Sequence, residues 1–108
     1  MKMPKYIVIH PIRKRTLEGM LKLPSEKNVL LRNLKSDCTD DADWVRSWAV
    51  PGQEKLYCEW NAKNPESIRK IFEKSEGGTG IEIEAINEMQ ILEGEDFEEK
   101  LISEAIQP

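Results

Sequence analysis

The sequence predicts an α+β domain whose elements follow the order β-α-β-β-α-β, with a further helix at the C-terminus. Two β-rich runs, residues 44–50 and 55–61, flank a Pro-Gly turn and indicate a β-hairpin. A β-rich run near the N-terminus precedes the hairpin, and an Asn-Pro helix start follows it. With 108 residues, the chain is long enough for one domain and too short for two ordinary ones.

The first half of the chain predicts one strand and one clear helix. Residues 6–10 are β-rich, and Pro11 ends this run because proline disfavours continued sheet pairing. Residues 16–20 indicate a helical turn at most, since Gly19 interrupts the pattern. Ser25 fits the N-cap of the next helix. The apolar face of that helix comprises Val29, Leu30, Leu31 and Leu34.

The second half has stronger local signals. At the hairpin turn, proline presets φ and Gly52 accepts the positive φ of a type II turn. Asn64 fits the N-cap of the second helix, with Pro65 at its first position. The glycine-rich residues 77–80 end this helix, and residues 81–92 predict the last strand region.

This order is that of the ferredoxin-like, or split βαβ, sandwich with a four-stranded antiparallel sheet. We assign residues 3–92 to the domain. Residues 93–108 form a C-terminal extension, in which residues 95–106 predict an amphipathic helix.

Side-chain alternation predicts two different faces for the hairpin. Even-numbered residues of the first strand share a face with odd-numbered residues of the second. The face expected beneath the helices is small and apolar and contains Val45, Ser47, Ala49, Leu56, Cys58 and Trp60. The open face is expected to contain Trp44, Arg46, Trp48, Tyr57, Glu59 and Asn61.

The first and last strands extend the open face. Ile7 and Ile9 are expected beneath the helices, which places His10 on the open face, and Glu84 joins it from the last strand. The predicted ligand cleft therefore contains His10, Arg46, Trp48, Tyr57, Glu59 and Glu84. Because Trp and Tyr are enriched where a partner buries a surface, we expect a homodimer or a higher homo-oligomer.

Five of these residues have two interpretations each. His10 suits a metal ligand or a proton shuttle, or a hydrogen-bonded interface histidine. Arg46 and Glu59 suit the binding of an acidic ligand, or a structural ion pair. Trp48 and Tyr57 suit an aromatic pocket or a dimer core.

The composition argues against several classes of protein. The net charge of −4 and a pI near 5.1 argue against a nucleic-acid binder. No apolar run approaches the roughly 20 residues of a membrane span, and the N-terminus is not a secretory signal, so we expect a cytoplasmic protein. Cys38 and Cys58 lack the C-x-x-C spacing of zinc ribbons and thioredoxin-like sites.

Short motifs resemble a family of small, mostly uncharacterised bacterial and archaeal ferredoxin-like domains with nickel-binding members. They are Trp44-Val45-Arg46-Ser47-Trp48, Leu56-Tyr57-Cys58-Glu59-Trp60-Asn61-Ala62, Pro65-Glu66-Ser67-Ile68-Arg69 and Ile81-Glu82-Ile83. The resemblance covers about residues 3–92. It implies a dimeric α/β barrel, as in related small monooxygenases and muconolactone isomerases.

The resemblance also implies nickel or another divalent metal as a cofactor, with His10 as the candidate ligand. Nickel-binding members carry several histidines, including one where this sequence has Arg46. Nickel favours imidazole ligands, so one histidine per subunit argues against a site of the family type.

Three functions are compatible with these patterns. The favoured one is a dimeric protein that binds a metal ion or small ligand through His10, Glu59 and Glu84. The second is a cofactor-independent isomerase or monooxygenase-like enzyme acting on a small hydrophobic acid. There, Arg46 pairs with the carboxylate and His10 or Glu59 moves a proton. The third is a protein-interaction module.

Overall fold

The computed structural model describes residues 2–74 and 81–97. These residues form an α+β fold with a four-stranded antiparallel sheet and three α-helices. The elements are β1 (Lys5–Pro11), α1 (Lys14–Lys22), α2 (Val29–Ser36), β2 (Ala42–Val50), β3 (Lys55–Ala62), α3 (Pro65–Lys74) and β4 (Ala85–Met89).

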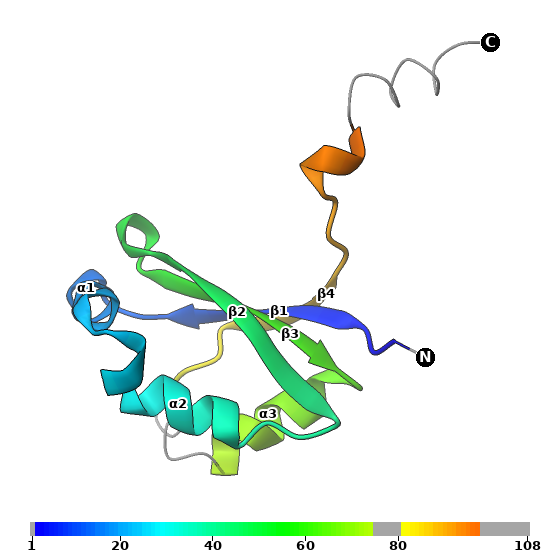
Figure 1. The fold of residues 1–108 in the computed structure, drawn as a ribbon, viewed down its shortest axis with the longest axis horizontal. Coiled ribbons are helices and arrows are strands. Elements are labelled where there is room, and N and C mark those ends of the chain that lie inside the picture. The colour runs from blue at the N-terminus through cyan, green and yellow to red at the C-terminus, as the bar shows by residue number, and fades with distance from the viewer. Residues whose placement is uncertain (1, 75–80, 98–108) are drawn as a thin grey trace.

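The strand order is β2-β3-β1-β4, and each neighbouring pair is antiparallel. This order is compatible with the predicted ferredoxin-like arrangement. The helices lie on one side of the sheet, with α1 near the hairpin turn (Figure 1). The opposite face is therefore open. None of the helices in the described residues is long and apolar enough to cross a membrane.

One core lies between the helices and the sheet. Trp60 of β3 is fully buried, and its ring centroid lies 5.6 Å from that of Phe72 on α3. Leu17 of α1 and Leu34 of α2 are buried in the same cluster. All three helices therefore cover one apolar face.

The predicted start of α3 is confirmed. The Asn64 side-chain oxygen accepts a hydrogen bond from the Ser67 amide at 2.9 Å, which is N-cap geometry. The start of α2 differs from the prediction. Its N-cap is Asn28, which accepts from the Leu31 amide at 3.3 Å, while residues 25–27 form a 3-10 turn. α1 is a nine-residue helix, longer than the predicted turn.

The hairpin turn has a different geometry from the type II turn predicted. Residues 51–53 form a 3-10 turn, and Glu54, instead of Gly52, adopts the left-handed conformation with φ 54° and ψ 48°. The Glu54 amide donates to the Pro51 carbonyl at 3.0 Å. Val50 pairs with Lys55, so four residues link the strands. Near the turn, even-numbered residues of β2 therefore share a face with odd-numbered residues of β3, which is the predicted parity.

Further along the hairpin a β-bulge at Val45 changes the parity. Trp44 pairs with Trp60, whereas Arg46 pairs with Glu59, which leaves Val45 as the extra residue. Trp44 packs against the helix-side core, and Val45 is 37% exposed. The prediction that placed Trp44 on the open face and Val45 in the core was therefore wrong.

The predicted orientation of β1 was also wrong. Tyr6 pairs with Trp60 and His10 with Leu56, so both point toward the helices, as does Val8. Ile7, which pairs with Glu59, lies on the open face instead. β1 lies between β3 and β4, and apolar residues occupy both its odd and its even positions. The alternation of side chains therefore does not indicate which set faces the helices.

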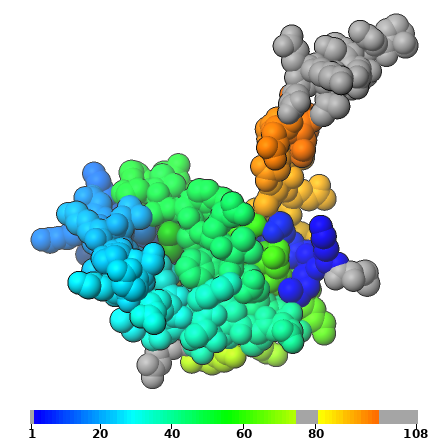
Figure 2. Space-filling view, in the orientation of Figure 1, coloured from blue at the N-terminus to red at the C-terminus, as the bar shows by residue number. Residues whose placement is uncertain are grey.

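β4 is shorter than the predicted strand region, and Ile81 and Ile83, which precede it, pack against the core. Beyond β4 the described extension ends in a 3-10 turn, Gly94–Phe97, and this end stands clear of the body of the domain (Figure 2). The predicted helix stop at 77–80 and most of the predicted tail helix lie outside the described residues.

Candidate functional site

The open face of the sheet contains a groove of about 520 Å³. Four of the predicted cleft residues line it together: Arg46, Trp48, Tyr57 and Glu59. The extension after β4 adds Ile91 and Glu93 to one wall. The volume lies within the usual range for small-molecule sites.

Glu59 is the unusual residue of this groove, because its carboxylate is buried on a face that is otherwise open. Its side chain is 2% exposed, and Oε2 accepts a hydrogen bond from Lys5 Nζ at 2.7 Å. Lys5 also donates to the Asn61 side-chain oxygen at 2.9 Å. A buried charge is costly unless it is paired, and Lys5 provides that pairing.

The second oxygen of Glu59 faces Arg46. Oε1 lies 3.0 Å from Arg46 Nε, which is an ion-pair distance, but the Nε–H group does not point at Oε1 as a hydrogen bond requires. Oε1 is thus buried without a hydrogen bond. The Arg46 side chain is 64% exposed, and this pair uses its Nε atom. The terminal nitrogens Nη1 and Nη2 are the part of the guanidinium that presents paired donors to a carboxylate.

An aromatic pair forms the neighbouring wall. Trp48 and Tyr57 pair directly on β2 and β3, which agrees with the prediction that they share a face. Trp48 is 45% exposed, and the Tyr57 hydroxyl donates to the Gln53 side-chain oxygen at 2.6 Å. This bond ties the phenol to the hairpin turn, and Tyr57 lines the groove together with Trp48.

Glu84 is not among the residues that line the groove. It precedes β4, where its amide donates to the Ile9 carbonyl at 2.7 Å and its carboxylate forms an ion pair with Lys55. The prediction that grouped Glu84 with Glu59 depended on a last strand that begins earlier than β4 does.

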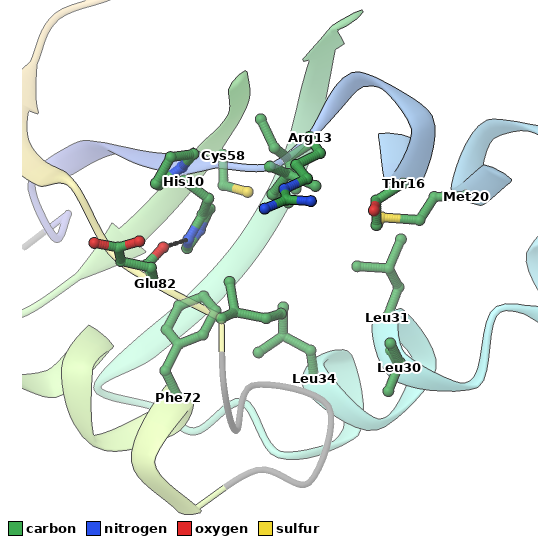
Figure 3. Close-up of a pocket in the computed structure, with 14 residues that line it drawn as sticks. His10, Arg13, Thr16, Met20, Leu30, Leu31, Leu34, Cys58, Phe72 and Glu82 are labelled. Atoms are coloured by element: carbon green, nitrogen blue, oxygen red, sulfur yellow. Dashed lines mark hydrogen bonds between the residues drawn. The ribbon is translucent and has the colours of Figure 1, made fainter. Parts of the chain in front are cut away.

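His10 lies on the other side of the sheet. It is 1% exposed, its ring centroid lies 5.0 Å from that of Phe72, and Nδ1 lies 2.9 Å from the Glu82 carbonyl oxygen. Burial lowers the pKa of His10, opposed by the hydrogen bond to Glu82. His10 lines a separate cavity beneath the helices (Figure 3).

Lys5, the ion-pair partner of Glu59, was not predicted from the sequence. Had β1 been oriented correctly, Lys5 and Ile7 would have been placed on the open face opposite Asn61 and Glu59. The sequence Lys-Tyr-Ile-Val-Ile does indicate this orientation. A lysine is rarely buried in a core, so Lys5, and with it Ile7, is expected on the open face.

The described residues do not provide a metal site of the ordinary kind. Within residues 2–74 and 81–97, no three His, Cys, Asp or Glu side chains are grouped so that they could hold a metal ion. His10 is buried in largely apolar surroundings, and Glu59 already lies between two cations. These residues do not fit a nickel ion bound within one chain.

The family model described as "Nickel responsive protein SCO4226-like" matches residues 6–89. The chain belongs to the SCO4226-like family. The match begins in β1 and ends at the last residue of β4, so the SCO4226-like region coincides with the sheet and its helices. Comparisons with curated proteins and with solved structures found no match.

Membership in the SCO4226-like family confirms the resemblance inferred from the hairpin and helix motifs. This SCO4226-like chain has Arg46 in its open groove and its one histidine on the helix side. Its groove chemistry is therefore that of a guanidinium, a buried carboxylate and aromatic walls.

Proposed function

We propose that the protein binds a small apolar carboxylic acid in its open-face groove. The observation that supports this is the arrangement of Arg46 against the buried carboxylate of Glu59. Glu59 contacts Nε and fixes the guanidinium, which leaves its terminal donors for an incoming carboxylate.

The walls of the groove suit the apolar part of such a ligand. Apart from Arg46, Glu59 and Glu93, its lining is aliphatic or aromatic: Ile7, Trp48, Val50, Tyr57, Met89 and Ile91. Lys5 and Arg46 balance the charges of Glu59 and Glu93, so the attraction for a carboxylate rests on the terminal guanidinium donors of Arg46. The family description adds nickel responsiveness, but the groove offers nickel no imidazole.

Phenylacetate and phenylacetamide are suitable matched probes, since they share size and shape and differ in charge. We expect phenylacetate to bind about tenfold more tightly, because a hydrogen bond to a charged group contributes about 1.5–3 kcal/mol. Amide NMR shifts in β2 and β3, together with the Trp48 indole signal, report the binding and its location.

Two Arg46 variants test the role of the guanidinium. Arg46→Gln should remove the preference for the carboxylate, and Arg46→Lys should keep part of it, since lysine has the charge without the planar fork. Equal binding of both probes to the original chain, or a preference that survives in Arg46→Gln, would exclude this function.

We further propose that two copies pair through their open faces and so close the groove. Trp48 is 45% exposed and Ile91 41%, and aromatic residues exposed on an open sheet suit a protein interface. Trp48→Asp should shift a dimer to monomer in sedimentation velocity. The matched control is Val29→Asp, because Val29 is 59% exposed on the helix side. A monomer at all protein concentrations would contradict the pairing.

A further inference from the structure

A second cavity lies on the helix side of the sheet, beneath α1 and α2 (Figure 3). Its volume is about 330 Å³, at the small end of the range for ligand sites. Most of its lining is apolar, with Met20 from α1, Leu30, Leu31 and Leu34 from α2, Leu56 from β3 and Phe72 from α3. The sheet separates this cavity from the open-face groove.

His10 is the buried polar side chain in this apolar lining. The Glu82 carbonyl can only accept a hydrogen bond, so the proton of the neutral imidazole is on Nδ1. Burial lowers the His10 pKa, which keeps the ring neutral near pH 7. Nε2 is therefore a hydrogen-bond acceptor. Among the described residues no hydrogen bond reaches Nε2.

The chemistry of the lining restricts what can occupy the cavity. An ammonium group would lose its hydration without gaining a buried counter-ion, since the carboxylate of Glu82 is exposed to solvent. A carboxylate would meet the Nε2 lone pair, and the charged Arg13 is exposed at the rim. A neutral donor satisfies Nε2 without either cost. A hydroxyl group on an apolar body fits both the acceptor and the walls.

We propose that this cavity binds a small apolar molecule with one hydroxyl group, which donates its hydrogen to His10 Nε2. The carbon skeleton lies against the leucines of α2. This site lies on the opposite side of the sheet from the carboxylate site proposed above, and neither depends on the other.

The test uses 2-naphthol and 2-methoxynaphthalene with the full-length chain. The two probes share a ring system, and the ether replaces the donor hydrogen by a methyl group. We expect 2-naphthol to bind about three- to tenfold more tightly, the effect of one hydrogen bond. Methyl NMR shifts of Met20, Leu31 and Leu34 should move with both probes and locate them in the cavity.

Three variants separate the contribution of the His10 acceptor to binding from the contribution of the cavity space. His10→Phe keeps an aromatic ring next to Phe72 but has no acceptor, so both probes should bind with equal affinity. Leu31→Trp fills the space and should weaken both. Leu92→Trp, at a position that is 79% exposed and lines neither pocket, should change neither affinity and is the matched control.

Several results would overturn this site. They are equal affinities for the original chain, a preference for 2-naphthol that survives in His10→Phe, and an absence of binding by either probe. Shifts confined to Ile7 and Met89 would place the probes in the open-face groove and would also overturn it. If His10→Phe does not fold, the affinities of the two probes for the unmodified chain and for Leu31→Trp still decide whether the site exists.

Discussion

At the scale of single residues, the two cysteines differ in their surroundings. Burial raises the pKa of Cys58 to about 11, although the Ser47 hydroxyl donates a hydrogen bond to its sulfur at 3.0 Å. Cys38 is only half-buried. The thiolate is the nucleophile, and at pH 8 about one Cys58 in a thousand would be ionised.

We therefore expect iodoacetamide to modify Cys38 much faster than Cys58 in the folded protein at pH 8. Peptide mass spectrometry after timed quenching measures both rates. Unfolding in denaturant is the control, since it should make the two rates similar. Equal rates in the folded protein would show that Cys58 is accessible.

His10 gives a pH dependence of stability. The pKa of His10 is lowered in the fold by burial, while the unfolded chain has the ordinary value of 6.5. The unfolded state therefore binds more protons below that value, so the free energy of unfolding falls as pH decreases from 6.5 toward the lowered pKa.

Denaturant unfolding of the original chain and of His10→Phe between pH 5 and 7.5 measures this effect. We expect the original chain to lose stability on acidification within this range, and the variant to lose less. Parallel curves would mean that His10 titrates normally in the fold. The comparison removes the contribution of carboxylates, which both proteins share.

At the scale of elements, the hairpin turn also caps a helix. The Glu54 side chain accepts a hydrogen bond from the Lys14 amide at 2.9 Å, and its carbonyl accepts one from the Ile12 amide at 3.1 Å. Arg13, the N-cap residue of α1, provides no side-chain cap. Glu54 therefore satisfies a free amide of α1 from a distant part of the chain.

Two substitutions separate the cap from the left-handed backbone. Glu54→Ala should lower the free energy of unfolding by about 0.5–1 kcal/mol, because it loses the cap and keeps the strained φ. Glu54→Gly also loses the cap but relieves about 1 kcal/mol of left-handed strain, so it should be more stable than Glu54→Ala. Thermal and urea unfolding measure the difference, and the opposite order would contradict it.

The elements also show what could be predicted from the sequence. The start of α3 was predictable because Asn64 and Pro65 act locally. The orientation of β1 was not, because Ile7 and Val8 are equally apolar and the direction depends on pairing with β3. The bulge at Val45 was hidden for a similar reason, since it depends on how the two strands fit together.

At the scale of the whole molecule, the fold class could be predicted, and so could the grouping of the hairpin residues that line the groove. Arg46, Trp48, Tyr57 and Glu59 lie together because parity is preserved between the turn and the bulge. His10 was misplaced because it belongs to β1. The predicted grouping of side chains therefore agrees with the structure where it depends on one hairpin, and differs from it where it depends on strand assembly.

The family match and the sheet both end at Met89, which predicts that the extension is not needed for folding. We expect a chain that ends at Gly94 to keep its fold, with amide NMR signals of β1 and β3 unchanged and a melting temperature within a few degrees. The control is the full-length chain under identical conditions. Loss of signal dispersion would show that the extension belongs to the folding unit.

The bulge at Val45 has a consequence for aggregation. β2 is an edge strand of nine residues, and a regular strand of that length is a template for the addition of a strand from another molecule. The extra residue interrupts the regular spacing of amides and carbonyls near the middle of this edge. Edge-to-edge polymerisation is thereby disfavoured, and face-to-face contact is left as the easier route of self-association.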